Sequence, residues 1–237
     1  MRCQTAAVRS QTRPLSRVEA RDPYDGLRPW SAVTHGAGAV LSVIGTAALL
    51  IGSARAGLWL RFVLFAVYGL SMIGLYTAST LYHCLNTSVP VRISLRKFDH
   101  CSIYLLIAGS YTPICLTVLR DCGGPLLLAA VWSVGIAGIV LTLIRLSIPR
   151  WLTSTLYLFM GWLAVFAISP IYRLLPAEGF FWLLMGGIMY SAGGILYALK
   201  WPGRDNPRFG FHEIFHVFIL AGSICHFILM YRIILPY

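Results

Sequence analysis

The chain has 237 residues, of which 58% are hydrophobic and only 11% are charged. A soluble domain carries about 25% charged residues, so this composition excludes a soluble globular protein and predicts a surface covered largely by lipid. The net charge of +11 would favour a nucleic-acid partner for a soluble protein, but in a membrane protein it indicates arginine-rich cytoplasmic loops, and we expect no nucleic-acid partner.

The first 32 residues contain six arginines and no apolar run. We therefore expect residues 1–32 to form a flexible, basic cytoplasmic tail. Residues 33–237 are expected to form a single membrane domain, because the apolar runs that follow leave no room for a separate soluble domain.

Seven apolar runs after the tail are long enough to cross about 30 Å of hydrocarbon, which needs about 20 helical residues. The predicted fold class is an all-α membrane bundle of seven transmembrane helices, with short loops that make consecutive helices antiparallel neighbours. The predicted spans are Val33–Ser53, Leu58–Leu81, Cys101–Leu119, Pro125–Ile144, Leu152–Tyr172, Gly179–Leu199 and Phe211–Leu235.

Prolines and small residues within these spans predict local irregularity and close packing. Pro113 and Pro170 lie within the third and fifth spans and are expected to kink them. Small residues at helical spacing, such as Gly187 with Ser191, predict close contacts between helices.

The distribution of Lys and Arg orients the spans. Of the 19 such residues, 14 fall in the tail and in the second, fourth and sixth loops, and five fall on the other side. Because cytoplasmic loops carry an excess of Lys and Arg, we expect the N-terminus in the cytoplasm and the C-terminus outside, in a multi-pass protein of the cell membrane.

Polar side chains from three separate segments reach the cytoplasmic end of this predicted bundle. The second span ends near Ser79 and His83, the third begins near Asp99, and the seventh begins near His212 and His216. An ionisable group buried in a membrane costs about 2.5–3.5 kcal/mol or more, so groups gathered at one depth are functional candidates.

The spacing of the histidines predicts a metal site. His212 and His216 are four residues apart, so their rings project from one face of a helix. With His83 they supply three neutral imidazoles, the ligand set of a zinc ion that keeps one open position. Asp99 can orient one of these histidines, or accept a proton from a water on the metal. The six cysteines show no C-x-x-C pair and predict neither a disulfide framework nor a cysteine zinc site.

Two further histidines lie in the spans. His35 begins the first span on the same side and can border the site, and we expect it to pack at the helix end. His226 lies ten residues beyond His216, about 15 Å further along a helix, which is too far to share the metal.

The segment from His212 to His216 is literally H-E-x-x-H, the signature of zinc proteases that use its Glu as a general base. No Asp or Glu follows His216, and the third histidine of the longer protease motif is replaced by Gly222. An intramembrane protease with an upstream third ligand stays an alternative. The simpler interpretation of Glu213 is a carboxylate stabilised by the helix dipole in the first turn.

These motifs resemble the haemolysin III family, whose relatives include the progestin and adipoQ receptors. Ser79-Thr80-Leu81-Tyr82-His83 resembles its S-x-x-x-H element, Phe98-Asp99-His100 its third-span block, and the segment from Phe211 to Phe218 its H-x-x-x-H block. The short loops resemble the bacterial branch. One stretch departs: where family members often carry Glu and Asn before the Thr-His-Gly of the first span, this chain has Arg28, Pro29, Trp30 and Ser31.

The resemblance implies zinc held by His83, His212 and His216, with Asp99 on a zinc-coordinated water and Ser79 close by. It also implies a zinc-dependent hydrolase of a lipid amide or acyl bond, similar to membrane ceramidases, with Asp99 and Ser79 as its catalytic residues and a lipid or fatty acid as substrate or ligand. Two alternatives stay open: a receptor or membrane-stress sensor with structural zinc, and a pore-forming haemolysin active in cytolysis. The scarcity of charged residues in the spans offers little for a wide aqueous pore. The sequence does not determine the oligomeric state.

Overall fold

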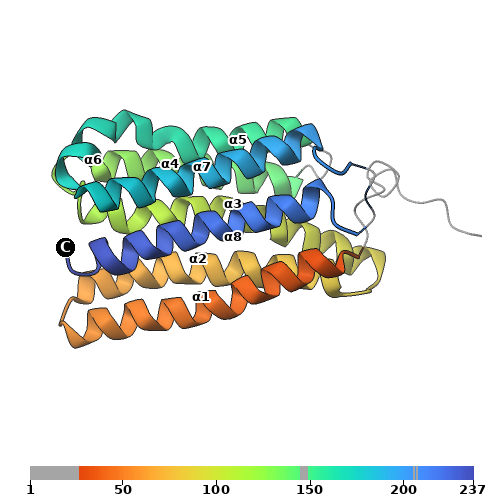
Figure 1. Cartoon of the computed structure of the whole chain (residues 1–237), viewed down its shortest axis with the longest axis horizontal. Helices are drawn as coiled ribbons and strands as arrows, with labels where there is room; N and C mark the ends of the chain where they lie inside the picture. The colour runs from red at the N-terminus through yellow and green to blue at the C-terminus, as the bar shows by residue number, and fades with distance from the viewer. Residues whose placement is uncertain (1–26, 145–148, 205, 207) are drawn as a thin grey trace, which may run out of the picture.

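The computed structural model describes residues 27–144, 149–204, 206 and 208–237, so most of the predicted basic tail lies outside the described residues. Within them the chain is helical, without a β-strand, and the helices lie alongside one another in one elongated bundle (Figure 1). The elements are α1 (Pro29–Arg55), α2 (Trp59–Cys84), α3 (Val89–Leu116), α4 (Gly124–Ile144), α5 (Arg150–Trp162), a 3-10 segment η1 (Leu163–Ala167), α6 (Ile168–Leu174), α7 (Ala177–Leu199), α8 (Phe211–Leu229) and a π segment η2 (Met230–Ile234).

These elements group into seven rods, because α5, η1 and α6 follow one another directly, as do α8 and η2. In the described part of the chain, six rods are long and apolar enough to cross a membrane, and α3 is the one that is not. The polar residues of α3 reduce its apolar character: its first turns carry Arg92, Arg96, Lys97 and Asp99.

The outer faces of the rods are apolar. Phe166 and Leu126, for example, are 85% and 78% exposed. A soluble protein does not present long rows of such side chains to water. Six long apolar rods whose outer faces are also apolar are typical of a multi-pass membrane protein.

The predicted fifth span, Leu152–Tyr172, is interrupted rather than continuous. The α-helix ends at Trp162, and one 3-10 segment precedes α6, whose first turn contains Pro170. Proline lacks the N–H that would bind the carbonyl four residues earlier, so a regular helix is disfavoured there. At the interruption, Tyr111 of α3 forms hydrogen bonds with backbone groups of this rod. Its hydroxyl accepts from the N–H of Ala164 at 2.9 Å and donates to the carbonyl of Gly161 at 2.5 Å.

The main core positions the site. Buried side chains of α1, α2 and α8, among them Leu49, Phe65, Tyr68 and Leu229, pack in one cluster. The last turn of α2 and the first turns of α8 face each other at one end of the bundle, where the Nε2 atoms of His83 and His212 lie 3.2 Å apart. The chain of α1 begins at this end, and the C-terminus lies at the other end (Figure 1).

Candidate metal centre

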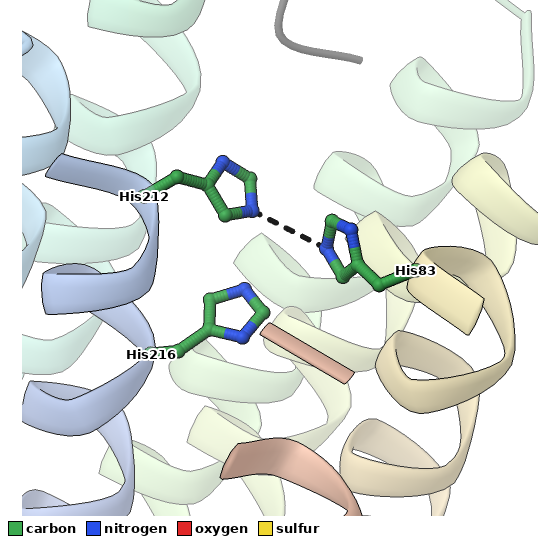
Figure 2. A group of neighbouring side chains, drawn as sticks. All are labelled: His83, His212 and His216. Atoms are coloured by element: carbon green, nitrogen blue, oxygen red, sulfur yellow. Dashed lines mark hydrogen bonds between the residues drawn. The ribbon is translucent and has the colours of Figure 1, made fainter. Parts of the chain in front are cut away.

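Three histidine rings meet where α2 ends and α8 begins (Figure 2). His83 and His216 are 1% and 2% exposed, and His212 is half-buried. One ligand nitrogen from each ring lies within 4.8 Å of the other two. The Nε2 atoms of His212 and His83 are 3.2 Å apart.

The start of α8 fixes two of these rings. The N–H of Gly210, the residue before the helix, donates to Glu213 Oε2 at 2.9 Å and anchors the first turn. His212 and His216 then project from successive turns of one helix face toward His83 on the last turn of α2 (Figure 2). The end of α2 and the start of α8 therefore bring the three imidazoles to one depth in the bundle.

The spacing between two of the ligand nitrogens matches a zinc ion. Zn–N bonds of about 2.0–2.1 Å in a tetrahedron separate ligand nitrogens by roughly 3.3 Å, close to the 3.2 Å between His212 and His83. His216 Nδ1 lies 3.3 Å from the Ser31 carbonyl. Since a carbonyl only accepts, this bond puts the proton on Nδ1 and leaves Nε2 available as a ligand. The cluster can hold a metal ion.

His35 of α1 stacks on this cluster. Its ring lies 3.6 Å from the His216 ring, centroid to centroid, at an interplanar angle of 16°, and the side chain is 2% exposed. It also meets the ring of Tyr76 edge-on. His35 was expected to pack at a helix end. It does pack, and it packs directly against a candidate metal ligand.

Glu213, the carboxylate of the H-E-x-x-H segment, is occupied elsewhere. Its Oε1 accepts from Arg28 Nη1 at 2.7 Å and from Ser31 Oγ at 3.1 Å, and its Oε2 accepts from Gly210. The side chain is only 2% exposed. A carboxylate with both oxygens engaged is not placed to activate water as a protease base. Arg28 and Ser31 belong to the stretch that departs from the family pattern, and here both contact this carboxylate.

A long cavity starts beside the histidine cluster. Its wall includes His212, His216, Ser79 and Asp99. Ser79 is 1% exposed and the Asp99 side chain 13% exposed. The Asp99 carboxylate is not part of the group of mutually close ligand atoms. The cavity thus brings the two residues predicted to be catalytic to the same space as two of the three histidines.

From the metal end the cavity runs between α3, α5, α7 and α8, and most of its wall is apolar. Sequence reasoning missed it. Its α3 wall includes one helix face, at spacings of i, i+3, i+4, i+7, i+8 and i+11, a pattern that equally predicts ordinary helix packing. These residues are Ile103, Leu106, Ile107, Ser110, Tyr111 and Ile114.

Comparison with known proteins identifies the family. The model of the family described as haemolysin-III related matches residues 29–227. This chain belongs to the haemolysin III family. The hemolysin-3 homolog of Bacillus subtilis strain 168 is 39% identical to it over 210 residues, which cover 87% of this chain and 95% of that protein. Hemolysin-3 of Bacillus cereus is 40% identical over 209 residues, covering 87% of this chain and 91% of that protein.

A more distant relative extends the family. The adiponectin receptor protein of Drosophila melanogaster is 30% identical over 193 residues, which cover 70% of this chain and 43% of the receptor. This similarity supports membership of the wider progestin and adipoQ receptor superfamily. The haemolysin III chain is thus a multi-pass membrane protein with a buried three-histidine cluster that can hold a metal ion.

Proposed function

We propose that this haemolysin III protein is a zinc-dependent hydrolase that cleaves an amide or related acyl bond of a lipid. The observation that carries the proposal is the combination of a three-imidazole cluster with Asp99 and Ser79 at one end of a long apolar cavity. A metal site closed on all sides would favour a purely structural ion, whereas this cluster borders open space.

In this proposal His83, His212 and His216 hold zinc through ring nitrogens. Zinc bound by three histidines acts as a Lewis acid on a carbonyl and makes water a better nucleophile near neutral pH. Asp99 holds the attacking water by a hydrogen bond and takes its proton as general base. Ser79 orients the water or the scissile carbonyl by hydrogen bonding rather than acting as a nucleophile, because α2 has no nucleophile elbow.

The shape of the cavity supports a lipid substrate. Asp99 and Leu119 both contribute to its wall, and 20 residues separate them along the α3 rod and the turn that follows, a span of roughly 30 Å if helical throughout. An apolar space of that length matches a hydrocarbon chain better than a sugar or a peptide. The chain would lie between α3, α5, α7 and α8, with the scissile bond at the histidine end.

The proposal includes a membrane topology. We infer that α3 is the seventh span and that the N-terminus is cytoplasmic, because 14 of the 19 Lys and Arg residues fall on that side. The histidine cluster lies at the end where α1 begins, so hydrolysis would take place near the cytoplasmic face.

The test is metal content together with hydrolysis. The purified protein is expected to contain about one zinc per chain and to hydrolyse a ceramide-type lipid amide. The double substitution His212→Ala with His216→Ala is expected to abolish both, since it leaves a single imidazole. His226→Ala is the matched control for metal content, because it removes an imidazole ten residues beyond His216 on the same helix.

Two results would change the assignment. Full zinc content in the double variant would reject the three-histidine site. A zinc-loaded protein that cleaves no lipid amide would reject the hydrolase and favour a receptor or membrane-stress sensor in which zinc is structural.

A further inference from the structure

We propose that a second polar site, halfway along the cavity, recognises a neutral oxygen-bearing group on the hydrocarbon chain of the bound lipid. The mid-cavity site consists of Tyr190 on α7 with Ser223 and His226 on α8. Tyr190 and His226 form part of the cavity wall, and Ser223 lies behind them, 4% exposed. The inference rests on the proposed function in one respect only, that the cavity receives a lipid chain.

A chain of hydroxyls from α2 reaches the cavity at Tyr190. The Tyr76 hydroxyl donates to Ser223 Oγ at 2.7 Å, and Ser223 Oγ is 2.9 Å from the Tyr190 hydroxyl. If Ser223 donates to Tyr190, the Tyr190 proton is left for a further acceptor. If Tyr190 donates to Ser223, its oxygen keeps lone pairs for a further donor. In either arrangement the Tyr190 hydroxyl retains capacity for one more hydrogen bond.

His226 adds the complementary group. Its ring lies edge-on to Tyr190, with centroids 5.3 Å apart, and its Nε2 is 3.4 Å from the Leu183 carbonyl. Because a carbonyl only accepts, this contact puts the proton on Nε2 and makes Nδ1 an acceptor. Nδ1 is buried and has no hydrogen-bond partner among the described residues. Nδ1 is enclosed as the ring lies in this structure, so a ligand hydroxyl would reach it after a small rotation of the ring, and such a bond would remove the cost of a buried acceptor without a partner.

Two glycines make room for the two polar rings. A Cβ at Gly186 would lie 2.2 Å from His226 Cδ2, and a Cβ at Gly222 would lie 2.7 Å from the Tyr190 ring. Any side chain at either position would displace the ring opposite it. The contact between α7 and α8 is therefore shaped around Tyr190 and His226.

Hydrogen bonding between helices does not by itself account for the mid-cavity site. Hydrogen bonds between helices are common in membrane proteins, and they explain the bond between Tyr76 and Ser223. They do not explain a histidine on the cavity wall whose Nδ1 binds nothing in the described structure.

The chemistry of the wall defines the ligand group. Among the described residues that line the cavity, Asp99 at the metal end is the only one that is an acid, a lysine or an arginine. A carboxylate or phosphate halfway along would have no counter-ion, whereas a hydroxyl can donate to His226 and accept from Tyr190. His226 lies ten residues beyond His216, so this hydroxyl would sit about 15 Å from the metal end.

The test compares two fatty acids, stearate and stearate with a hydroxyl about 15 Å from its carboxylate along the extended chain. Their affinities for the purified full-length protein are measured by displacement of a fluorescent fatty acid. The wild type is expected to bind the hydroxylated acid roughly 3- to 10-fold more tightly, the effect of one or two hydrogen bonds. Tyr190→Phe removes a single oxygen and is expected to bring this ratio close to one.

Ser110→Ala is the matched control. Ser110 also lines the cavity, on α3, but it is not part of the mid-cavity site, and its one hydroxyl proton is donated to the Ile107 carbonyl at 2.8 Å. This variant is expected to keep the wild-type ratio, and melting temperatures verify that both variants are folded. Equal affinities in the wild type, no binding of either acid, or a ratio unchanged in Tyr190→Phe would each overturn the inference. A protein that keeps the ratio but hydrolyses no lipid amide would reject the hydrolase and leave the mid-cavity site standing.

Discussion

The two carboxylates beside the predicted metal ligands differ in what surrounds them. Glu213 is 2% exposed and accepts hydrogen bonds from Arg28, Ser31 and Gly210. Asp99 is 13% exposed and lies in the cavity wall with His212 and His216. Only Asp99 therefore faces the space in which a substrate would lie, although Glu213 is the carboxylate that the H-E-x-x-H pattern singles out.

The substitution Asp99→Asn tests whether Asp99 acts in catalysis or supports the structure. The amide keeps the size of the side chain and can still bind water, but it cannot take up a proton. We expect the zinc content and melting temperature to stay at their wild-type values. The rate of lipid-amide hydrolysis should fall by about 10²- to 10⁴-fold, roughly 3–5 kcal/mol of activation free energy. Joint loss of zinc and stability would instead make Asp99 a ligand or a structural group, and an unchanged rate would remove it from the mechanism.

At the scale of elements, the contact between α7 and α8 depends on which glycine faces which helix. The spacing of Gly187 and Ser191 predicted a close contact, but a Cβ at Gly187 would meet nothing within 4 Å, and this residue lines the cavity. The prediction is wrong for Gly187 only, because the Ser191 hydroxyl accepts a hydrogen bond from Trp162 Nε1 of α5 at 2.9 Å. The neighbouring Gly186, rotated by about 100° around the helix, is the residue that touches α8.

Alanine at these two adjacent positions is expected to have opposite effects. Gly186→Ala forces the His226 ring to move, because the new Cβ would approach it to 2.2 Å, and such overpacking typically costs about 1–3 kcal/mol. Gly187→Ala adds a methyl group in open space and is expected to be neutral or to stabilise the helix by up to about 1 kcal/mol. Thermal unfolding of the two variants in the same detergent measures the difference. Equal melting temperatures would mean that α7 is rotated differently against α8.

At the scale of the whole molecule, the histidine cluster lies where α2 ends and α8 begins. The start of α1 lies at this end of the bundle, and the C-terminus lies at the other (Figure 1). The loop between α7 and α8, which contains Lys200, Arg204 and Arg208, is at the histidine end. One measurement of topology therefore also determines the side of the membrane on which the proposed hydrolysis occurs.

Reporter fusions test this orientation. A reporter after Tyr237 is expected to read as external, and one inserted in the loop from Lys200 to Gly210 as cytoplasmic, because Lys and Arg concentrate on the loop side. Both reporters on one side would contradict a membrane crossing by α8. A third reporter, placed before Pro29, on the same side as the one after Tyr237 would contradict an odd number of spans and exclude α3 as the seventh. Exchange of the two sides would reject the charge argument and move the histidine cluster to the outer face.

The sequence by itself determined the membrane class, the approximate positions of six of the seven rods and the identity of the three histidines. The third rod begins at Val89, 12 residues before the predicted span Cys101–Leu119. These features follow from the lipid environment, because a membrane span must be a long apolar run and an imidazole within such a run is rare. The four-residue spacing of His212 and His216, and the end of the apolar run at His83, were enough to bring the three rings to one depth.

Only the tertiary structure decided which groups these residues face. The stacking of His35 on His216 and the pairing of Glu213 with Arg28 join the start of α1 to α8, and the bond between Tyr190 and Ser223 joins α7 to α8. The cavity is likewise enclosed by several helices. In a membrane every span is apolar on many faces, so periodicity does not reveal which face a helix turns inward. That is decided by the fit of side chains at each helix contact, as where Gly186 admits the ring of His226.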